Sequence, residues 1–91
     1  MLTIRYSAKF KSDYKLIKKR GYDTRLLEEV LEMLSTEQPL PQKYRDHVLA
    51  GSFGGQRECH ITSDWLLIYK IEKDELILLL TRTGTHSDLF R

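Results

Sequence analysis

The sequence predicts an α+β fold, in which two N-terminal helices pack on one face of a four- to five-stranded, mostly antiparallel sheet. Two observations support this prediction. Between residues 8 and 36 apolar side chains recur with the roughly 3.6-residue period of a helix, whereas the second half of the chain holds apolar runs of strand length separated by turn residues. At 91 residues, the chain is expected to be a single domain, residues 1–91, with the element order β-α-α-β-β-β-β and a short C-terminal tail or helix.

The chain begins with a predicted strand over residues 2–6, where Leu, Ile and Tyr alternate with Thr and Arg. Ser7 can then cap a helix that runs to about Arg20, and Gly21 favours the left-handed conformation that ends it. The predicted buried side chains of this helix lie four and three residues apart: Phe10, Tyr14 and Ile17.

A second helix is predicted to begin near Asp23 or Thr24 and to run to about Thr36. Its apolar side chains share one face and are Leu27, Val30, Leu31 and Leu34. Pro39 and Pro41 end the helical part of the chain, because proline cannot continue a helix and restrains the residue before it.

Residues 42–55 are predicted to form a loop, a short strand near residues 48–51 and a glycine-rich turn. Residues 56–70 then show two apolar stretches separated by Thr62, Ser63 and Asp64, which favour turns. This pattern predicts a β-hairpin.

Two further stretches, residues 66–71 and 75–83, are almost continuously apolar, with a polar turn at residues 72–74. Continuous hydrophobicity is typical of central strands that are covered on both faces. The tail that follows is polar but ends on the aromatic Phe90, and a tail without a function would more often fray.

Composition argues against a membrane protein. The longest apolar run, residues 76–80, is far shorter than the roughly 20 residues that span a bilayer. Arg5, Lys9 and Lys11 interrupt the N-terminus, which therefore has no apolar signal-peptide core. Cys59 is the only cysteine, which excludes an internal disulfide and agrees with a reducing compartment. We therefore expect a cytoplasmic protein without a membrane partner, with Cys59 as a core residue rather than a nucleophile.

The net charge of +2 hides an uneven distribution. The first 20 residues hold seven basic side chains and one acidic side chain, Asp13. Such a surface suits a polyanion such as nucleic acid, and it also suits an acidic protein partner. The candidate RNA-binding side chains are those of the predicted first helix: Lys9, Lys11, Lys15, Lys18, Lys19 and Arg20.

The predicted hairpin carries an unusual polar face. Side chains two apart on a strand share a face, which places Glu58 beside His60 and opposite Arg57, Cys59 and Ile61. A carboxylate beside an imidazole, with Asp64 in the adjoining turn, is a candidate acid/base cluster. The alternative is a solvated polar face without a catalytic role.

The predicted sheet also holds two more histidines, His47 and His86, and Arg82 at the end of the last strand. The spacing of the histidines matches no compact zinc motif, and no nucleotide-binding glycine motif is present, so we expect neither a metal nor another cofactor. Metal-free cleavage of RNA fits better, because it needs a base, an acid and a cation that stabilises charge on the phosphate. Phe90 or Trp65 could stack on an unpaired base, although core packing is the alternative for Trp65.

Four segments of the second half stand out together: Asp46-His47-x-Leu-x-Gly51, Arg57-Glu58-Cys59-His60, Ser63-Asp64-Trp65-Leu66-Leu67-Ile68-Tyr69 and Arg82-Thr83-Gly84-Thr85-His86-x-x-Leu89-Phe90. In this order and spacing they resemble the YafQ branch of the RelE-like toxins of bacterial toxin-antitoxin systems, and the resemblance covers nearly the whole chain. It implies a fold like that of microbial ribonucleases and an endoribonuclease that cuts messenger RNA in the ribosomal A site. It also implies a cognate ribbon-helix-helix antitoxin that wraps the toxin, and operator DNA contacted only through that antitoxin.

Carried over position by position, the resemblance implies an active site made of His47, His60, Asp64, His86 and Phe90, with Arg82 and Trp65 beside them. Glu58 stands where the best-known members have aspartate, so its carboxylate is kept but reaches further, and a direct role for it stays open.

Our mechanistic hypothesis takes His86 as the general acid and either Asp64, or His60 oriented by Asp64, as the general base. Arg82 and His47 would stabilise the transition state, and Phe90 would hold the base next to the scissile bond. The basic first helix would contact ribosomal RNA.

Two other function classes are alternatives. The same fold could be a catalytically silent module that binds an antitoxin in an autoregulatory operator complex. Loss of the imidazole and arginine set would favour that alternative, and here the set is complete. A small DNA-binding protein acting alone is disfavoured, because the sequence shows no helix-turn-helix pattern.

Overall fold

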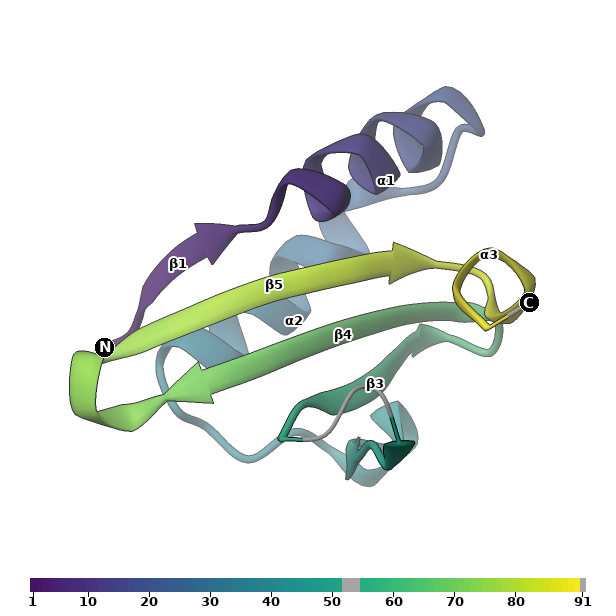
Figure 1. The fold of residues 1–91 in the computed structure, drawn as a ribbon. Helices are drawn as coiled ribbons and strands as arrows, with labels where there is room; N and C mark the ends of the chain where they lie inside the picture. Colours follow the sequence, from purple (N-terminus) through teal and green to yellow (C-terminus); the bar gives the residue numbers. More distant parts are fainter. Residues whose placement is uncertain (52–54, 91) are drawn as a thin grey trace.

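The computed structural model describes residues 1–51 and 55–90, and these residues form a five-stranded sheet with one long helix behind it and another alongside the edge of its last strand (Figure 1). The strands are β1 (Thr3–Tyr6), β2 (His47–Val48), β3 (Arg57–Thr62), β4 (Trp65–Glu72) and β5 (Ile77–Gly84). The helices are α1 (Ala8–Lys19), α2 (Thr24–Ser35) and the short α3 (His86–Leu89). The predicted fold class is confirmed.

The sheet has the order β1-β5-β4-β3-β2, with β1 and β2 at its edges. β1 pairs parallel with β5, and the other three pairings are antiparallel. One 3-10 turn, Gln42–Tyr44, lies between α2 and β2, and another, Lys73–Glu75, connects β4 to β5. Among the described residues, no helix is long and apolar enough to cross a membrane.

The two long helices begin and end close to the predicted positions, because their signals are local. Ser7 caps α1 by accepting a hydrogen bond from the backbone N–H of Phe10, and its own hydroxyl donates to the carbonyl of Thr81 on β5. Asp23 caps α2 by accepting from the N–H of Arg25. Gly21 between the helices has a φ of 82°, as the left-handed stop requires.

The main core lies between the helices and one face of the sheet, which we call the helix face. It contains the predicted helix side chains Phe10, Ile17, Leu27, Val30 and Leu34, and the strand side chains Cys59, Ile61, Trp65, Leu67, Tyr69, Leu78 and Leu80. The opposite face, which we call the open face, carries a smaller cluster of Leu66, Ile68 and Leu89, with Leu49 and Phe90 packed against it. Because both faces are covered, all side chains of β4 from Trp65 to Tyr69 are buried, as the continuous hydrophobicity predicted.

The predicted strand near residues 48–51 is shorter than expected and consists of His47–Val48. Beyond it, one hydrogen bond from the N–H of Leu49 to the carbonyl of Gln56 continues the contact with the chain before β3. The glycine-rich turn predicted there falls on residues 52–54, which lie outside the described residues.

An irregularity in the last strand decides which side chains reach the open face. Arg82 pairs with Ile68, whereas Leu80 pairs with Tyr69, so Thr81 is an extra residue in β5. Such a bulge shifts the alternation by one position. Arg82 therefore shares the register of the open-face Ile68, and Thr83 turns into the core.

Candidate active site

Two histidines and one carboxylate meet on the open face where β2 pairs with β3. His47 lies opposite Glu58 in the register. The Nε2 atoms of His47 and His60 lie 3.5 Å and 3.4 Å from the same oxygen of Glu58, Oε1. The Glu58 side chain is 8% exposed, whereas those of His47 and His60 are 50% and 20% exposed. The predicted shared face of Glu58 and His60 is confirmed, and the carboxylate lies beneath two accessible imidazoles.

Hydrogen bonds to backbone carbonyls fix the orientation of both rings. Nδ1 of His47 lies 2.7 Å from the carbonyl of Arg45, and Nδ1 of His60 lies 3.3 Å from that of Ser63. A carbonyl only accepts, so each Nδ1 donates and each Nε2 faces Glu58. In a neutral ring that Nε2 carries a lone pair, and its contact with a carboxylate is attractive only when a proton lies between them. Each imidazole therefore presents Nε2 to the buried carboxylate of Glu58.

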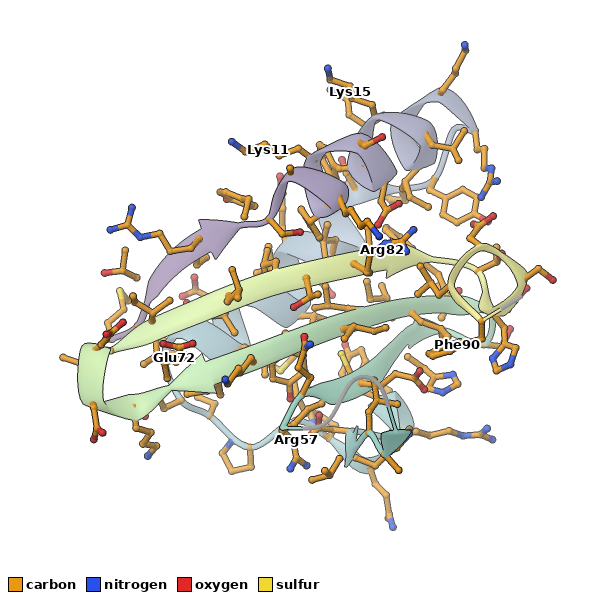
Figure 2. The ribbon with its side chains drawn as sticks, in the orientation of Figure 1. Lys11, Lys15, Arg57, Glu72, Arg82 and Phe90 are labelled. Carbon is orange, nitrogen blue, oxygen red and sulfur yellow. The ribbon has the colours of Figure 1, made fainter. Side chains whose placement is uncertain are left out.

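The other candidate catalytic side chains come from α3, at the end of β5. The rings of His86 and Phe90 lie with their centroids 5.0 Å apart, and His86 is exposed while Phe90 is half-buried. Leu89, on the buried side of the helix, packs into the open-face cluster with Leu66 and Ile68. Figure 2 shows Phe90 beside α3 at the end of the sheet where β5 finishes.

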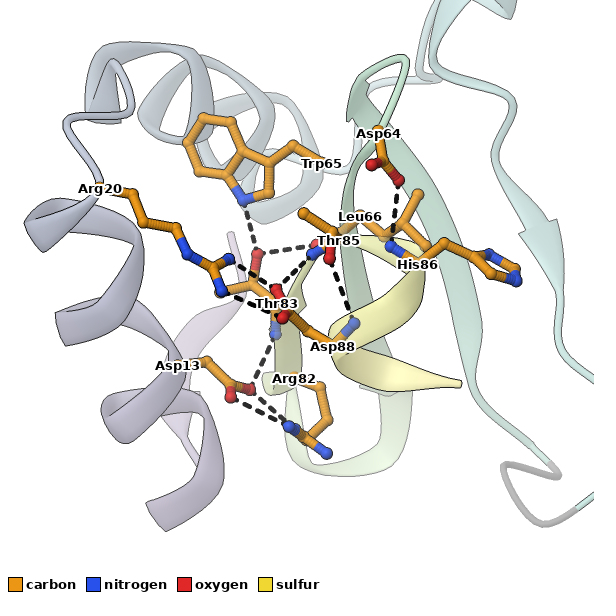
Figure 3. A network of polar contacts seen from close by, with 10 residues as sticks. All are labelled: Asp13, Arg20, Asp64, Trp65, Leu66, Arg82, Thr83, Thr85, His86 and Asp88. Carbon is orange, nitrogen blue, oxygen red and sulfur yellow. Dashed lines mark hydrogen bonds and ion pairs between the residues drawn. The ribbon is translucent and has the colours of Figure 1, made fainter. Parts of the chain in front are cut away.

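Asp64 binds the hairpin turn to α3. Its Oδ1 accepts a hydrogen bond of 3.1 Å from the backbone N–H of His86 (Figure 3). The hypothesis that Asp64 orients His60 is wrong for this structure, because Glu58 and the carbonyl of Ser63 are the partners of that ring. The sequence could not separate these alternatives, since Glu58 and Asp64 are both close to His60 along the chain.

Arg82 is held by an acidic residue that the sequence analysis counted only as a charge. Its Nε and Nη2 donate to the two carboxylate oxygens of Asp13 on α1, at 2.7 Å and 3.0 Å, and Asp13 also accepts from the N–H of Thr83. Hydrogen bonding to Asp13 raises the pKa of Arg82. The contacts of Arg82 within the described residues are with α1, not with the histidines. Asp13 is the only acidic residue in the basic first helix. This exception is the sequence signal that could have pointed to its role as a partner of Arg82.

Trp65 belongs to the core. It is 2% exposed on the helix face, its ring packs edge-on against Tyr22, and its indole N–H donates to the hydroxyl of Thr83, which in turn donates to the carbonyl of Leu66. The alternative that Trp65 stacks on an RNA base is therefore wrong, since the ring has no accessible face. Its contribution is to anchor the end of β5 from the helix face, through its hydrogen bond to Thr83.

A second carboxylate clamp holds the segment that leads into β2. Asp46 accepts hydrogen bonds from Nε and Nη2 of Arg57 on β3, at 3.1 Å and 2.8 Å to Oδ2, and from the phenol of Tyr69 on β4. Burial of Tyr69 and its bond to Asp46 raise the pKa of the phenol, which therefore stays a donor. Asp46 directly precedes His47, so this clamp fixes where His47 enters the sheet.

The basic residues of the first helix divide into two groups. The lysines are exposed (Lys9, Lys11, Lys15, Lys18 and Lys19), and Figure 2 shows Lys11 and Lys15 projecting away from the sheet. Arg20 differs, because its Nη1 and Nη2 donate to Asp88 of α3 at 2.7 Å and 3.1 Å. Its place among the RNA-binding side chains stays a prediction, and the structure adds that its guanidinium is paired with Asp88.

Cys59 lies on the helix face with no exposed surface. Burial raises the pKa of its thiol to about 12, so the thiolate is not available at neutral pH. The prediction of a core cysteine is confirmed. Within residues 1–51 and 55–90, no group of three or more His, Cys, Asp or Glu side chains is arranged to hold a metal ion.

Comparison with known proteins gives consistent matches over the whole chain. A family model described as the bacterial toxin of type II toxin-antitoxin systems, YafQ, matches residues 2–91. The mRNA interferase toxin YafQ of Escherichia coli strain K12 is 42% identical over 88 residues, which are 96% of this chain and 94% of that protein. Among solved structures, a metal-bound toxin from Helicobacter pylori is 51% identical, with a TM-score of 0.93 over 99% of this chain and 100% of the other. A chain of the Escherichia coli DinJ-YafQ complex is 40% identical, with a TM-score of 0.90 and complete coverage of both chains.

Proposed function

Because this chain belongs to the YafQ family of bacterial type II toxin-antitoxin toxins, we propose that it is an endoribonuclease that cleaves messenger RNA in the ribosomal A site. The Escherichia coli relative is named an mRNA interferase, and the present chain covers 94% of it. The observation that carries the proposal is the pairing of two accessible imidazoles with one buried carboxylate, Glu58, on the face to which α3 brings His86 and Phe90.

The proposed reaction is attack of a ribose 2'-hydroxyl on the adjacent phosphodiester. His60 takes the 2'-hydroxyl proton on Nε2, where Glu58 stabilises the resulting imidazolium. The 2'-oxygen forms a bond to phosphorus as the bond to the 5'-oxygen breaks, and His86 donates a proton to that leaving oxygen. The products are a 2',3'-cyclic phosphate and a free 5'-hydroxyl.

Charge that develops on the phosphate is stabilised by His47 and Arg82 in this proposal. Asp13 occupies Nε and Nη2 of Arg82, which leaves Nη1 for a phosphoryl oxygen. Phe90, beside His86, stacks on the base next to the scissile bond. Asp64 contributes by holding the backbone of His86 and remains the alternative base.

The first experiment is primer extension on a translated reporter messenger RNA after induction of the wild-type chain, the His86→Ala variant and the Ser87→Ala variant. We expect discrete cuts in phase with codons for the wild type and for Ser87→Ala, which changes an exposed neighbour on the same helix. His86→Ala should lose about a hundredfold or more in rate, the usual scale for one acid/base group. Cleavage that survives in His86→Ala would refute the general-acid role. Absence of cuts from all three, with normal growth, would favour the silent antitoxin-binding module.

Metal independence is part of the proposal, because imidazole and guanidinium groups can supply the acid, the base and the cation. Purified protein on programmed ribosomes should keep its cleavage rate when the protein is treated with EDTA, the chelator is removed and ribosomes are added in their own magnesium buffer. Loss of activity that is restored by zinc or copper would overturn this part, a relevant outcome since one relative is described as metal-bound.

We further propose a cognate ribbon-helix-helix antitoxin as the partner, with operator DNA bound only through it. Support comes from the Escherichia coli relative, which was crystallised with DinJ. A co-purified complex should bind operator DNA and be inactive in cleavage, whereas the isolated toxin should cleave and leave the DNA unshifted.

A further inference from the structure

We propose that Arg20 is a positioning residue for the RNA cleavage: by binding Asp88 it holds α3, and with it His86 and Phe90, against the end of α1. The inference rests on the proposed function for its catalytic consequence. Its structural part, that Arg20 determines where α3 lies, can be tested without any cleavage.

The contact joins two segments that are 68 residues apart in the sequence. Arg20 follows the last turn of α1 and reaches Asp88 with two nitrogens, Nη1 to Oδ2 at 2.7 Å and Nη2 to Oδ1 at 3.1 Å (Figure 3). Two parallel hydrogen bonds between a planar guanidinium and a carboxylate fix the orientation of both groups, which a single contact does not. The pair is therefore suited to set geometry.

Asp88 is also part of the cap that starts α3. Its Oδ2 accepts from the backbone N–H of Thr85 at 2.9 Å, and its own N–H donates to the hydroxyl of Thr85 at 3.1 Å. Gly84 makes room for this arrangement, because a Cβ at that position would lie 2.9 Å from Oδ2 of Asp88. One carboxylate thus holds the start of α3 and, through Arg20, the end of α1.

A helix of four residues depends on such external contacts. Among the described residues, backbone hydrogen bonds from Leu89 to Thr85 and from Phe90 to His86 close it, and so short a helix has little stability of its own. Its place is set by Leu89 in the open-face cluster, by Asp64 on the N–H of His86, and by Arg20 on Asp88. Among these three supports, Arg20 comes from a different layer of the fold.

The competing role for Arg20 is that of one more cation for RNA on the basic helix. Lys19 provides a matched control, because it is the neighbouring basic residue, it is exposed, and its replacement by Gln removes the same charge. The experiment is single-turnover cleavage on programmed ribosomes by the wild type, Arg20→Gln, Arg20→Lys and Lys19→Gln, giving for each the maximal rate and the half-saturating toxin concentration.

Arg20→Gln is expected to lower the maximal rate between about tenfold and a hundredfold, the range that small misplacements of catalytic groups produce, with the half-saturating concentration within about twofold. Lys19→Gln should instead raise the half-saturating concentration and leave the maximal rate nearly unchanged. Arg20→Lys should recover part of the rate, since lysine donates to Asp88 without the planar fork. Equal behaviour of Arg20→Gln and Lys19→Gln would overturn the proposal.

Two further measurements separate positioning from folding. The double variant Arg20→Gln/Asp88→Asn should be no slower than Asp88→Asn alone, because both changes break one contact, whereas additive losses would contradict the inference. In NMR spectra, Arg20→Gln should shift or broaden the amide signals of residues 86–90 and the ring signals of His86, while the signals of its main core stay in place. In the control variant Lys19→Gln, the signals of residues 86–90 should also stay in place. Unchanged α3 signals would refute the structural part. A wild type that cleaves no RNA would refute the proposed function and leave the NMR result valid.

Discussion

Four aspartates hold the segments that carry the candidate catalytic side chains: Asp13, Asp46, Asp64 and Asp88. Asp13 binds Arg82, Asp46 joins the chain before β2 to β3 and β4, Asp64 binds the backbone of α3, and Asp88 joins α3 to α1. An ionised carboxylate accepts from several donors at once, so one short side chain can tie two segments together. Of the four, only Asp64 has a chemical role that the sequence pattern predicts.

At the same scale, the buried Glu58 is predicted to act through the two imidazoles above it. Glu58→Gln should lower the maximal cleavage rate about tenfold or more, because an amide keeps the size but does not stabilise an imidazolium at Nε2. Glu58→Asp should lose less, since the charge remains. Cleavage assays combined with ¹⁵N spectra of the histidine rings would test this, with Glu29→Gln on the surface of α2 as the control. Equal rates for Glu58→Gln and the wild type would make Glu58 a structural residue only.

At the scale of elements, the last strand and α3 behave as one unit. The bulge at Thr81 places Thr83 under Trp65, and the chain then turns at Gly84 into the cap of α3. Because Asp88 closes that cap while bound to Arg20, the stability of α3 depends on the charge of one carboxylate.

This dependence predicts a pH effect. Arg20, together with the N–H of Thr85, holds the pKa of Asp88 well below its usual range. A lowered pKa in the folded state means that Asp88 contributes stability above the ordinary aspartate pKa of about 4, and that this contribution is lost as the pH falls further. In thermal melts between pH 6 and pH 2.5, the wild type should exceed Asp88→Asn in Tm at pH 6, and the difference should shrink below about pH 4. A difference that stays constant over this range would contradict the role of the charge; Asp74→Asn, in an exposed turn, is the control.

How much of this could be predicted depends on the distance along the chain over which each signal acts. The caps at Ser7 and Asp23 and the apolar periodicity of α1 and α2 are local, and both helices were predicted within a residue or two. The shared face of Glu58 and His60 follows from strand alternation alone. The bulge at Thr81 depends on how β4 pairs with β5, which no short sequence pattern predicts. The contacts of Arg20 and Asp13 join residues that are 68 and 69 positions apart, so no local pattern predicts them either.

At the scale of the whole molecule, the exposed lysines of α1 form a basic surface, from which Lys11 and Lys15 project away from the sheet (Figure 2). Lys11 and Lys15 also line a groove of about 440 Å³ between the helices, with an apolar floor that includes Phe10, Tyr14 and Leu27. Two partners could use this surface: the phosphates of ribosomal RNA, which the charge favours, or an antitoxin, which the groove favours. The proposed function needs both partners, so the question is which one binds here.

The variant Lys11→Gln/Lys15→Gln/Lys18→Gln is predicted to bind ribosomes more weakly, with a smaller dependence on salt, while its fold is kept. Each phosphate contact that is lost should reduce the slope of log affinity against log salt by roughly one unit, because fewer counterions are released on binding. Equilibrium binding to purified ribosomes at several salt concentrations measures this. The control Lys43→Gln/Lys70→Gln/Lys73→Gln removes the same charge from outside α1 and should keep the wild-type slope, since only contacts at the interface release ions. Unchanged ribosome binding by the α1 variant, together with weaker binding of the antitoxin, would instead assign this surface to the antitoxin and would leave ribosome recognition to residues near the active site.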